Sequence, residues 1–137
     1  MENSILNDVK QMLGLPADYT PFDPELITYI NTAIASLFHL GVGSTAFSIK
    51  DAEDEWGDWI TDLQVLEFVK TCVYLKTRLL FDPPASSTIL EANKACIDEL
   101  EWRIASLVDW EKLPADNERD LWVEYDEEFE LWRDEHE

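Results

Sequence analysis

The sequence predicts an all-α fold: a small bundle of four to five helices, with a short extended loop or strand pair and an acidic C-terminal arm. Three observations lead to this prediction. Apolar residues recur at helical spacing in four segments, proline or glycine stands beside the ends of these segments, and the composition turns sharply acidic after Pro114. A chain of 137 residues accommodates one domain and an appendage. We therefore expect a helical domain at residues 1–110 and an arm at residues 111–137.

Capping residues delimit the first two helices. The first is expected to begin behind Asn3 or Ser4 as the N-cap. Its apolar face comprises Ile5, Val9, Met12 and Leu13. Asp23 as an N-cap, followed by Pro24, predicts the start of the second helix. Gly41 predicts a left-handed residue just beyond the end of that helix.

The middle of the chain loses the helical period. Residues 43–50 alternate apolar and polar side chains, which suits an extended loop or a short strand. Residues 51–62 carry six acids and no basic residue, and we interpret them as a linker that Trp56 and Trp59 anchor, on a possible short helix. The acids are not spaced as in a calcium-binding loop, so a solvated acidic loop is expected.

Two long helices follow. The first of them is predicted from Leu63 to Leu80, because Pro83 and the proline after it force a turn. Thr88 and Glu91 are spaced as a capping box, which predicts the start of the longest helix. The apolar stripe of that helix consists of Ile89, Ala92, Cys96, Leu100, Ile104 and Leu107.

Charge and motifs exclude several classes of function. The chain has 30 acidic and 10 basic residues and a formal net charge of -20, so phosphate backbones are repelled and DNA binding by the isolated subunit is disfavoured. No GxSxG, HExxH, P-loop or GxGxxG motif appears, so we expect no enzyme, cofactor or metal site. No apolar run approaches the length of a membrane span, and no leader is recognisable, so synthesis in the cytosol is expected.

The cysteines and one histidine are expected to be structural. Cys72 and Cys96 lie within apolar periodic segments and outside any CxxC spacing, which is typical of small hydrophobic side chains in a reducing compartment. His39 stands near the end of the second helix, where an imidazolium favours the helix dipole.

Two stretches of the chain read ITYINTAIASLFHLGVG and YLKTRLLFDPPASSTILEANKACIDELEWRI. Both resemble the phage head-tail connector family, also called adaptor or head completion proteins. The resemblance spans residues 5–107, and its best markers are the FDPP turn at residues 81–84 and the LEWR element at residues 100–103. It implies a structural virion protein, assembled in the host cytoplasm, whose copies form a ring under the portal, commonly a dodecamer. Such a ring extends the DNA channel and docks the next neck, stopper or tail protein.

The acidic arm lies outside this resemblance. In residues 115–137 the acids outnumber the basic residues by 11 to 2. Four aromatic residues form one stripe at steps of 3, 4 and 3: Trp122, Tyr125, Phe129 and Trp132. Aromatic stripes of this kind anchor interfaces, so docking on a neighbouring subunit or on the portal is expected. Packing on its own domain, addition as a strand to a partner's sheet and disorder remain alternatives.

Four basic residues are notable because basic residues are scarce in this chain. They are Lys70, Lys76, Arg78 and Arg103. Each is a candidate for contact with an acidic face of the next subunit, and intramolecular pairing explains them equally well.

The charge alone also allows a second function from another class. An acidic protein that mimics DNA would inhibit a nuclease or a repressor by occupying its basic surface. The FDPP and LEWR elements favour the connector over this alternative.

Overall fold

The structure is a computed structural model that describes residues 3–43 and 46–111 of the chain. It contains four α-helices, α1 (Ile5–Met12), α2 (Asp23–His39), α3 (Leu63–Phe81) and α4 (Ser87–Glu111), and a short 3-10 helix, η1 (Trp56–Asp58). No strand occurs within the described residues. The prediction of an all-α bundle with four to five helices is confirmed. The aromatic stripe of the arm lies outside the described residues.

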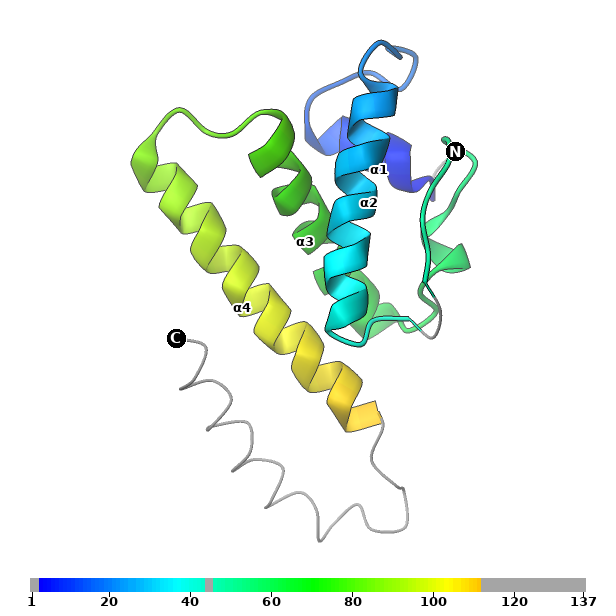
Figure 1. Ribbon diagram of the computed structural model, residues 1–137, viewed down its shortest axis with the longest axis vertical. Coiled ribbons are helices and arrows are strands. Elements are labelled where there is room, and N and C mark those ends of the chain that lie inside the picture. The colour runs from blue at the N-terminus through cyan, green and yellow to red at the C-terminus, as the bar shows by residue number, and fades with distance from the viewer. Residues whose placement is uncertain (1–2, 44–45, 112–137) are drawn as a thin grey trace, which may run out of the picture.

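Helix α3 is the central element of the bundle. It packs against α2 on one side and α4 on the other, and α1 contacts both α2 and α3 (Figure 1). Helix α3 runs antiparallel to both long neighbours, so its end lies at the same end of the bundle as the starts of α2 and α4 (Figure 1). The FDPP turn, which connects α3 to α4, therefore closes this end.

Helix α1 begins where the sequence predicts. Of the two candidate N-caps, Ser4 is the one used, and its hydroxyl accepts a hydrogen bond from the backbone amide of Asn7 at 3.2 Å. The segment before α1 runs beside the acidic linker: Trp56 N donates to Asn3 O at 3.0 Å. One isolated antiparallel bridge, between Ser4 and Glu55, takes the place of the predicted strand pair. The alternative of an extended loop is confirmed for residues 46–50.

The predicted N-cap of α2 is wrong, whereas the predicted glycine beyond its C-terminal end is confirmed. Asp23 is not the N-cap but the first helical residue, behind Phe22, because its carboxylate binds the Lys10 ammonium at 2.8 Å instead of backbone amides. Gly41 follows the C-cap with φ +101°. Its amide bonds to Phe38 O and that of Val42 to Leu37 O, which is the Schellman pattern that glycine favours at this position.

Helix α3 ends within one residue of its predicted boundary, whereas the predicted start of α4 is wrong. Helix α4 begins at Ser87, and Ser86 Oγ accepts the N–H of Ile89 at 3.4 Å. Ser86 supplies the capping oxygen two residues before Thr88, so the predicted box does not form. Glu91 instead approaches Lys94 at 3.9 Å.

The predicted apolar stripe of α4 is wrong in its first half. The side chains of Ile89, Ala92 and Cys96 are exposed, and the first buried residue is Ile97. Farther along, Ile104 is fully buried. Because α4 has α3 as its principal neighbour, only a narrow face of its first turns is covered, and helical spacing alone does not identify that face.

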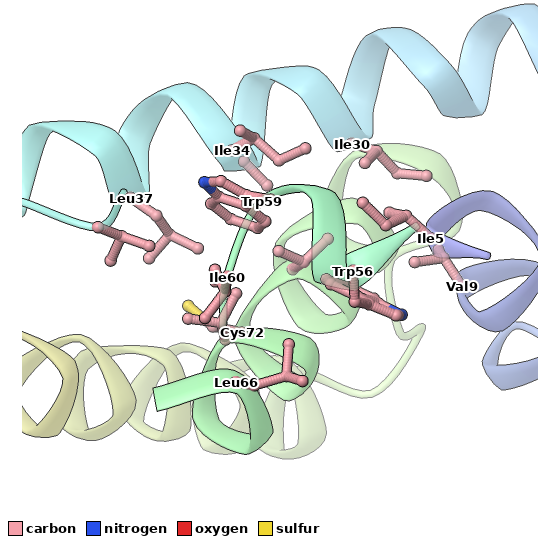
Figure 2. Close-up of a cluster of buried hydrophobic side chains, with 14 of the residues drawn as sticks. Ile5, Val9, Ile30, Ile34, Leu37, Trp56, Trp59, Ile60, Leu66 and Cys72 are labelled. Carbon is pink, nitrogen blue, oxygen red and sulfur yellow. The ribbon is translucent and has the colours of Figure 1, made fainter. Parts of the chain in front are cut away.

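The tryptophans of the acidic linker are inserted into the core, as predicted. Figure 2 shows Trp56 and Trp59 within a cluster of buried side chains from α1, α2 and α3. Trp56 is 1% exposed, its indole N–H donates to Asp8 Oδ2 at 2.8 Å, and Lys70 Nζ lies 5.8 Å from the ring centroid. Trp59 stacks on Phe47 with centroids 5.8 Å apart. The linker is therefore attached to the bundle at two points.

Candidate interaction surfaces

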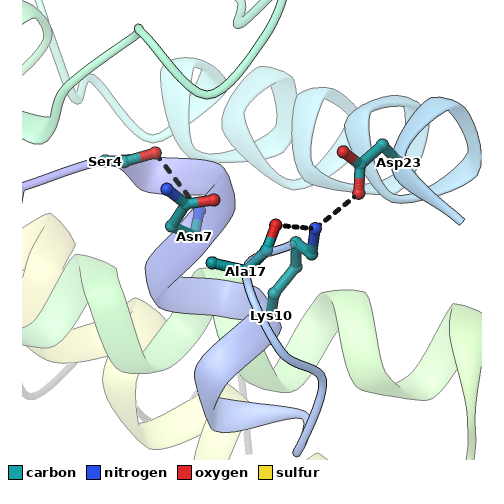
Figure 3. A network of polar contacts seen from close by, with 5 residues as sticks. All are labelled: Ser4, Asn7, Lys10, Ala17 and Asp23. Carbon is teal, nitrogen blue, oxygen red and sulfur yellow. Dashed lines mark hydrogen bonds and ion pairs between the residues drawn. The ribbon is translucent and has the colours of Figure 1, made fainter. Parts of the chain in front are cut away.

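A buried lysine organises the loop between α1 and α2. The Lys10 side chain is 1% exposed, and its ammonium donates to Ala17 O at 2.9 Å and pairs with Asp23 Oδ1 at 2.8 Å (Figure 3). One cation thereby binds two points of the chain six residues apart. Sequence reasoning missed this contact. The available signal is that Lys10 is the only lysine or arginine in the first 49 residues.

The loop that Lys10 holds carries exposed aromatic residues. Tyr19 packs against Phe22 with ring centroids 5.8 Å apart, and Phe22 meets Phe81 edge-on at 5.2 Å. Tyr19 is 44% exposed and Phe22 37%. Leu80, which precedes Phe81, is 51% exposed. We call Tyr19, Phe22, Leu80 and Phe81 the aromatic end face, because they lie where α2 begins and α3 ends.

The charges beside the aromatic end face are negative. Asp18 precedes Tyr19 and Asp82 follows Phe81, and both acids are exposed. Neither residues 11–49 nor residues 79–93 contain a lysine or an arginine. The two segments that build the end face thus bring carboxylates and no ammonium or guanidinium group of their own.

The four basic residues singled out in the sequence have partners within the subunit. Lys70 lies over Trp56, and Arg78 donates to the Tyr74 hydroxyl at 3.2 Å. The other two form ion pairs. They are Lys76 with Glu101 at 3.0 Å, which joins α3 to α4, and Arg103 with Glu99 at 3.0 Å along α4. Contact of any of them with a neighbouring subunit stays a prediction.

The acidic linker uses its carboxylates as local hydrogen-bond acceptors. Asp54 Oδ2 accepts the amides of Lys50 at 2.6 Å and Asp51 at 3.2 Å, and the bond from Lys50 is the main reason that the pKa of Asp54 is lowered. Glu55 and Asp58 form a reciprocal capping box around η1. In the part of the chain that the structure describes, no three histidine, cysteine or acidic side chains are arranged to hold a metal ion.

The two cysteines differ, although the sequence suggested the same role for both. Cys72 is fully buried, and burial raises the pKa of its thiol to about 12. Cys96 is exposed on the outer side of α4, which corrects its expected place in an apolar stripe.

This difference predicts selective alkylation. Because the thiolate is the reactive species, iodoacetamide at neutral pH should modify one thiol per folded chain, at Cys96, and two in denaturant. Mass spectrometry of the intact protein counts the adducts, and a Cys96→Ser variant serves as the control. Modification of folded Cys96→Ser at the rate of the parent protein would contradict the burial of Cys72.

Comparison with known proteins decides the family. The family model of the phage connector protein matches residues 5–110, a range that contains α1, α2, α3 and all but the last residue of α4. The chain belongs to the phage connector protein family. No curated protein and no solved structure matches the connector.

Membership of this family indicates a virion-associated structural protein at the head-tail connection, associated with other head or tail proteins. Structural proteins of this family are generally not enzymes. Across the described residues of the connector, no helix combines the length and the apolar character that crossing a membrane requires.

Proposed function

We propose that the connector is an adaptor subunit that assembles into a ring, commonly a dodecamer, under the portal. The ring extends the DNA channel and docks the next neck, stopper or tail protein. The observation that carries this proposal is the family match over residues 5–110, because it covers the helical domain and not one short motif.

The physical chemistry of the chain supports a passive conduit. Identical subunits joined by a heterologous interface close into a ring when the rotation between them closes. A net charge of -20 repels the phosphate backbone, so a channel wall built from such subunits lets DNA slide without binding it. The charge would equally suit a DNA mimic, and the family match favours the connector.

Negative-stain microscopy of the full-length connector mixed with the purified portal of the same phage tests this function. The expected result is additional ring-shaped density under the portal. If no complex forms and the protein competes with DNA for a basic DNA-binding protein, the result would contradict the connector function and favour the DNA mimic.

The arm is proposed to clamp the ring to the portal or to an adjacent subunit through its aromatic stripe. At least one acid stands between each aromatic residue of the stripe and the next: Trp122, Tyr125, Phe129 and Trp132. An acidic, aromatic segment suits a basic groove, because the aromatic rings supply buried area and the acids supply charge complementarity.

Deletion of residues 112–137 tests the clamp. The truncated connector should keep the cooperative unfolding of its helical domain, because the four described helices end at Glu111. Its affinity for the portal should fall by about tenfold or more, as expected when several aromatic anchors are lost. A fourfold change of the arm aromatics to serine gives the same test at constant length, and unchanged portal affinity in both variants would refute the clamp.

Among the four basic residues, Arg103 is the strongest candidate for a contact between subunits. It is exposed on α4, and its pair with Glu99 is a surface pair of the i,i+4 kind, which contributes only about 0.3–0.5 kcal/mol. Arg103→Gln should therefore weaken ring assembly, measured by analytical ultracentrifugation, with little change in the free energy of unfolding. Lys94→Gln is the matched control, since Lys94 also forms an exposed pair on α4. Equal effects of the two changes would argue against a specific role for Arg103.

A further inference from the structure

The aromatic end face is an exposed apolar patch that the described residues of the subunit leave uncovered. Its three rings form a continuous row, because the Phe22 ring contacts both Tyr19 and Phe81, with centroids 5.8 and 5.2 Å apart. Leu80, which precedes Phe81 in the sequence, is half exposed. Clusters of exposed aromatic residues with a polar rim are typical of protein interaction sites.

The loop that presents this surface is held in place before any partner binds. The Lys10 ammonium binds Ala17 O and Asp23 Oδ1, which lie on either side of Tyr19 and Phe22 in sequence. Two turns add backbone bonds, Tyr19 N to Pro16 O at 3.1 Å and Asp23 N to Thr20 O at 3.1 Å. Preorganisation of this kind reduces the entropy lost on binding.

The charge around the aromatic end face indicates which kind of partner segment can bind there. Asp18 and Asp82 are exposed at its edges, and the segments that form it contain no lysine or arginine. A second copy of this chain, with 30 acids against 10 basic residues, and the acidic arm are both poor matches. A segment with an apolar side chain flanked by basic residues is complementary.

The position of the end face relative to the end of α4 suggests which neighbour provides that segment. The end face lies at the end of the bundle where α4 begins, and α4 runs to the opposite end before the arm starts (Figure 1). A helix of 25 residues separates these points by about 37 Å. An arm that grips the portal beside the end of α4 leaves the aromatic end face turned toward the other side of the ring.

We propose that the aromatic end face is the docking surface for the next neck or tail protein, through a basic segment of that protein with an apolar anchor. The inference rests on the proposed function, since it assumes a ring with the portal on one side. The anchor packs on Phe22, Leu80 and the exposed edge of Tyr19. The flanking basic side chains meet Asp18 and Asp82.

The test measures binding of full-length connector to two separate probes, the purified portal and the purified neck protein of the same phage. In the first variant Tyr19→Ser is combined with Leu80→Ser, both at exposed positions. The matched control combines Phe38→Ser with Leu63→Ser, exposed apolar residues near the end of α2 and at the start of α3, at the opposite end of the bundle. The end-face variant should bind the neck protein about tenfold or more weakly and the portal normally, whereas the control variant should bind both normally.

A second variant changes the charge beside the end face and preserves its apolar surface. Asp18→Asn combined with Asp82→Asn should lower the affinity for the neck protein and flatten its dependence on salt, because fewer charges are screened. Unchanged affinity in both the apolar and the charge variants would overturn the inference and leave the proposed function intact. Loss of portal binding, with neck binding retained, would overturn it by assigning the surface to the portal. A parent connector that binds neither probe would refute the proposed function as well.

Discussion

Replacement of Trp56 by alanine is expected to lower the free energy of unfolding by about 4 kcal/mol, the usual cost of removing a large buried aromatic side chain. Trp56 is 1% exposed and comes from a 3-10 helix of three residues, so its side chain is a principal apolar attachment of the acidic linker to the core. The substitution also leaves Asp8 without its indole donor and Lys70 without the ring beneath it. Urea denaturation followed by circular dichroism measures the change.

Two further substitutions separate the contributions of Trp56. Trp56→Phe keeps most of the apolar volume and removes the N–H that donates to Asp8, so we expect a loss of about 1–2 kcal/mol. Leu63→Ala, at a residue that is 74% exposed, is the control and should change stability by no more than about 0.5 kcal/mol. A cost for Trp56→Ala as small as that of Leu63→Ala would show that the linker is not anchored in the core.

Local chemistry explains why most helix boundaries were predictable. Ser4, Pro24 and Gly41 act on the backbone within one turn of their own positions, so the sequence alone contains the relevant information. The incorrect predictions arise where another residue competes for the capping role or for the capping side chain. Asp23 would serve as an N-cap in isolation, but a lysine from another helix binds its carboxylate. Ser86 likewise provides the N-cap before Thr88 does.

The aromatic end face was not predictable for a different reason. Tyr19 and Phe22 lie in a loop without periodicity, and Phe81 closes a helix 59 residues after Phe22, so only the tertiary structure brings the rings together. The exposed positions of α4 illustrate the same limit. Spacing shows that Ile89 and Ile104 share a helix, but burial depends on where α3 covers that helix.

Replacement of Lys10 by methionine is expected to destabilise the connector by about 2 kcal/mol. Breaking a fully buried ion pair by removing one partner costs about 3–5 kcal/mol, because an uncompensated charge remains. Here the Asp23 side chain is 23% exposed, so water stabilises the remaining carboxylate and reduces the cost. Methionine preserves the length of the apolar stem, which separates the loss of charge from the loss of volume. Chemical denaturation measures the effect.

The Asp23 partner supplies the matched variants. If Lys10 acts mainly through charge, Lys10→Met combined with Asp23→Asn should be less destabilising than the sum of the single changes, because no unpaired charge remains in the double variant. Additive effects would contradict a coupled pair.

Hydrogen exchange should also show faster exchange at Tyr19 and Asp23 in Lys10→Met, since their amides donate within the turns that Lys10 holds. If exchange in the loop becomes faster while the helices keep their protection, the buried lysine chiefly fixes the conformation of the loop that carries Tyr19 and Phe22. Lys10→Met should then bind the neck protein more weakly, although it alters no residue of the aromatic end face.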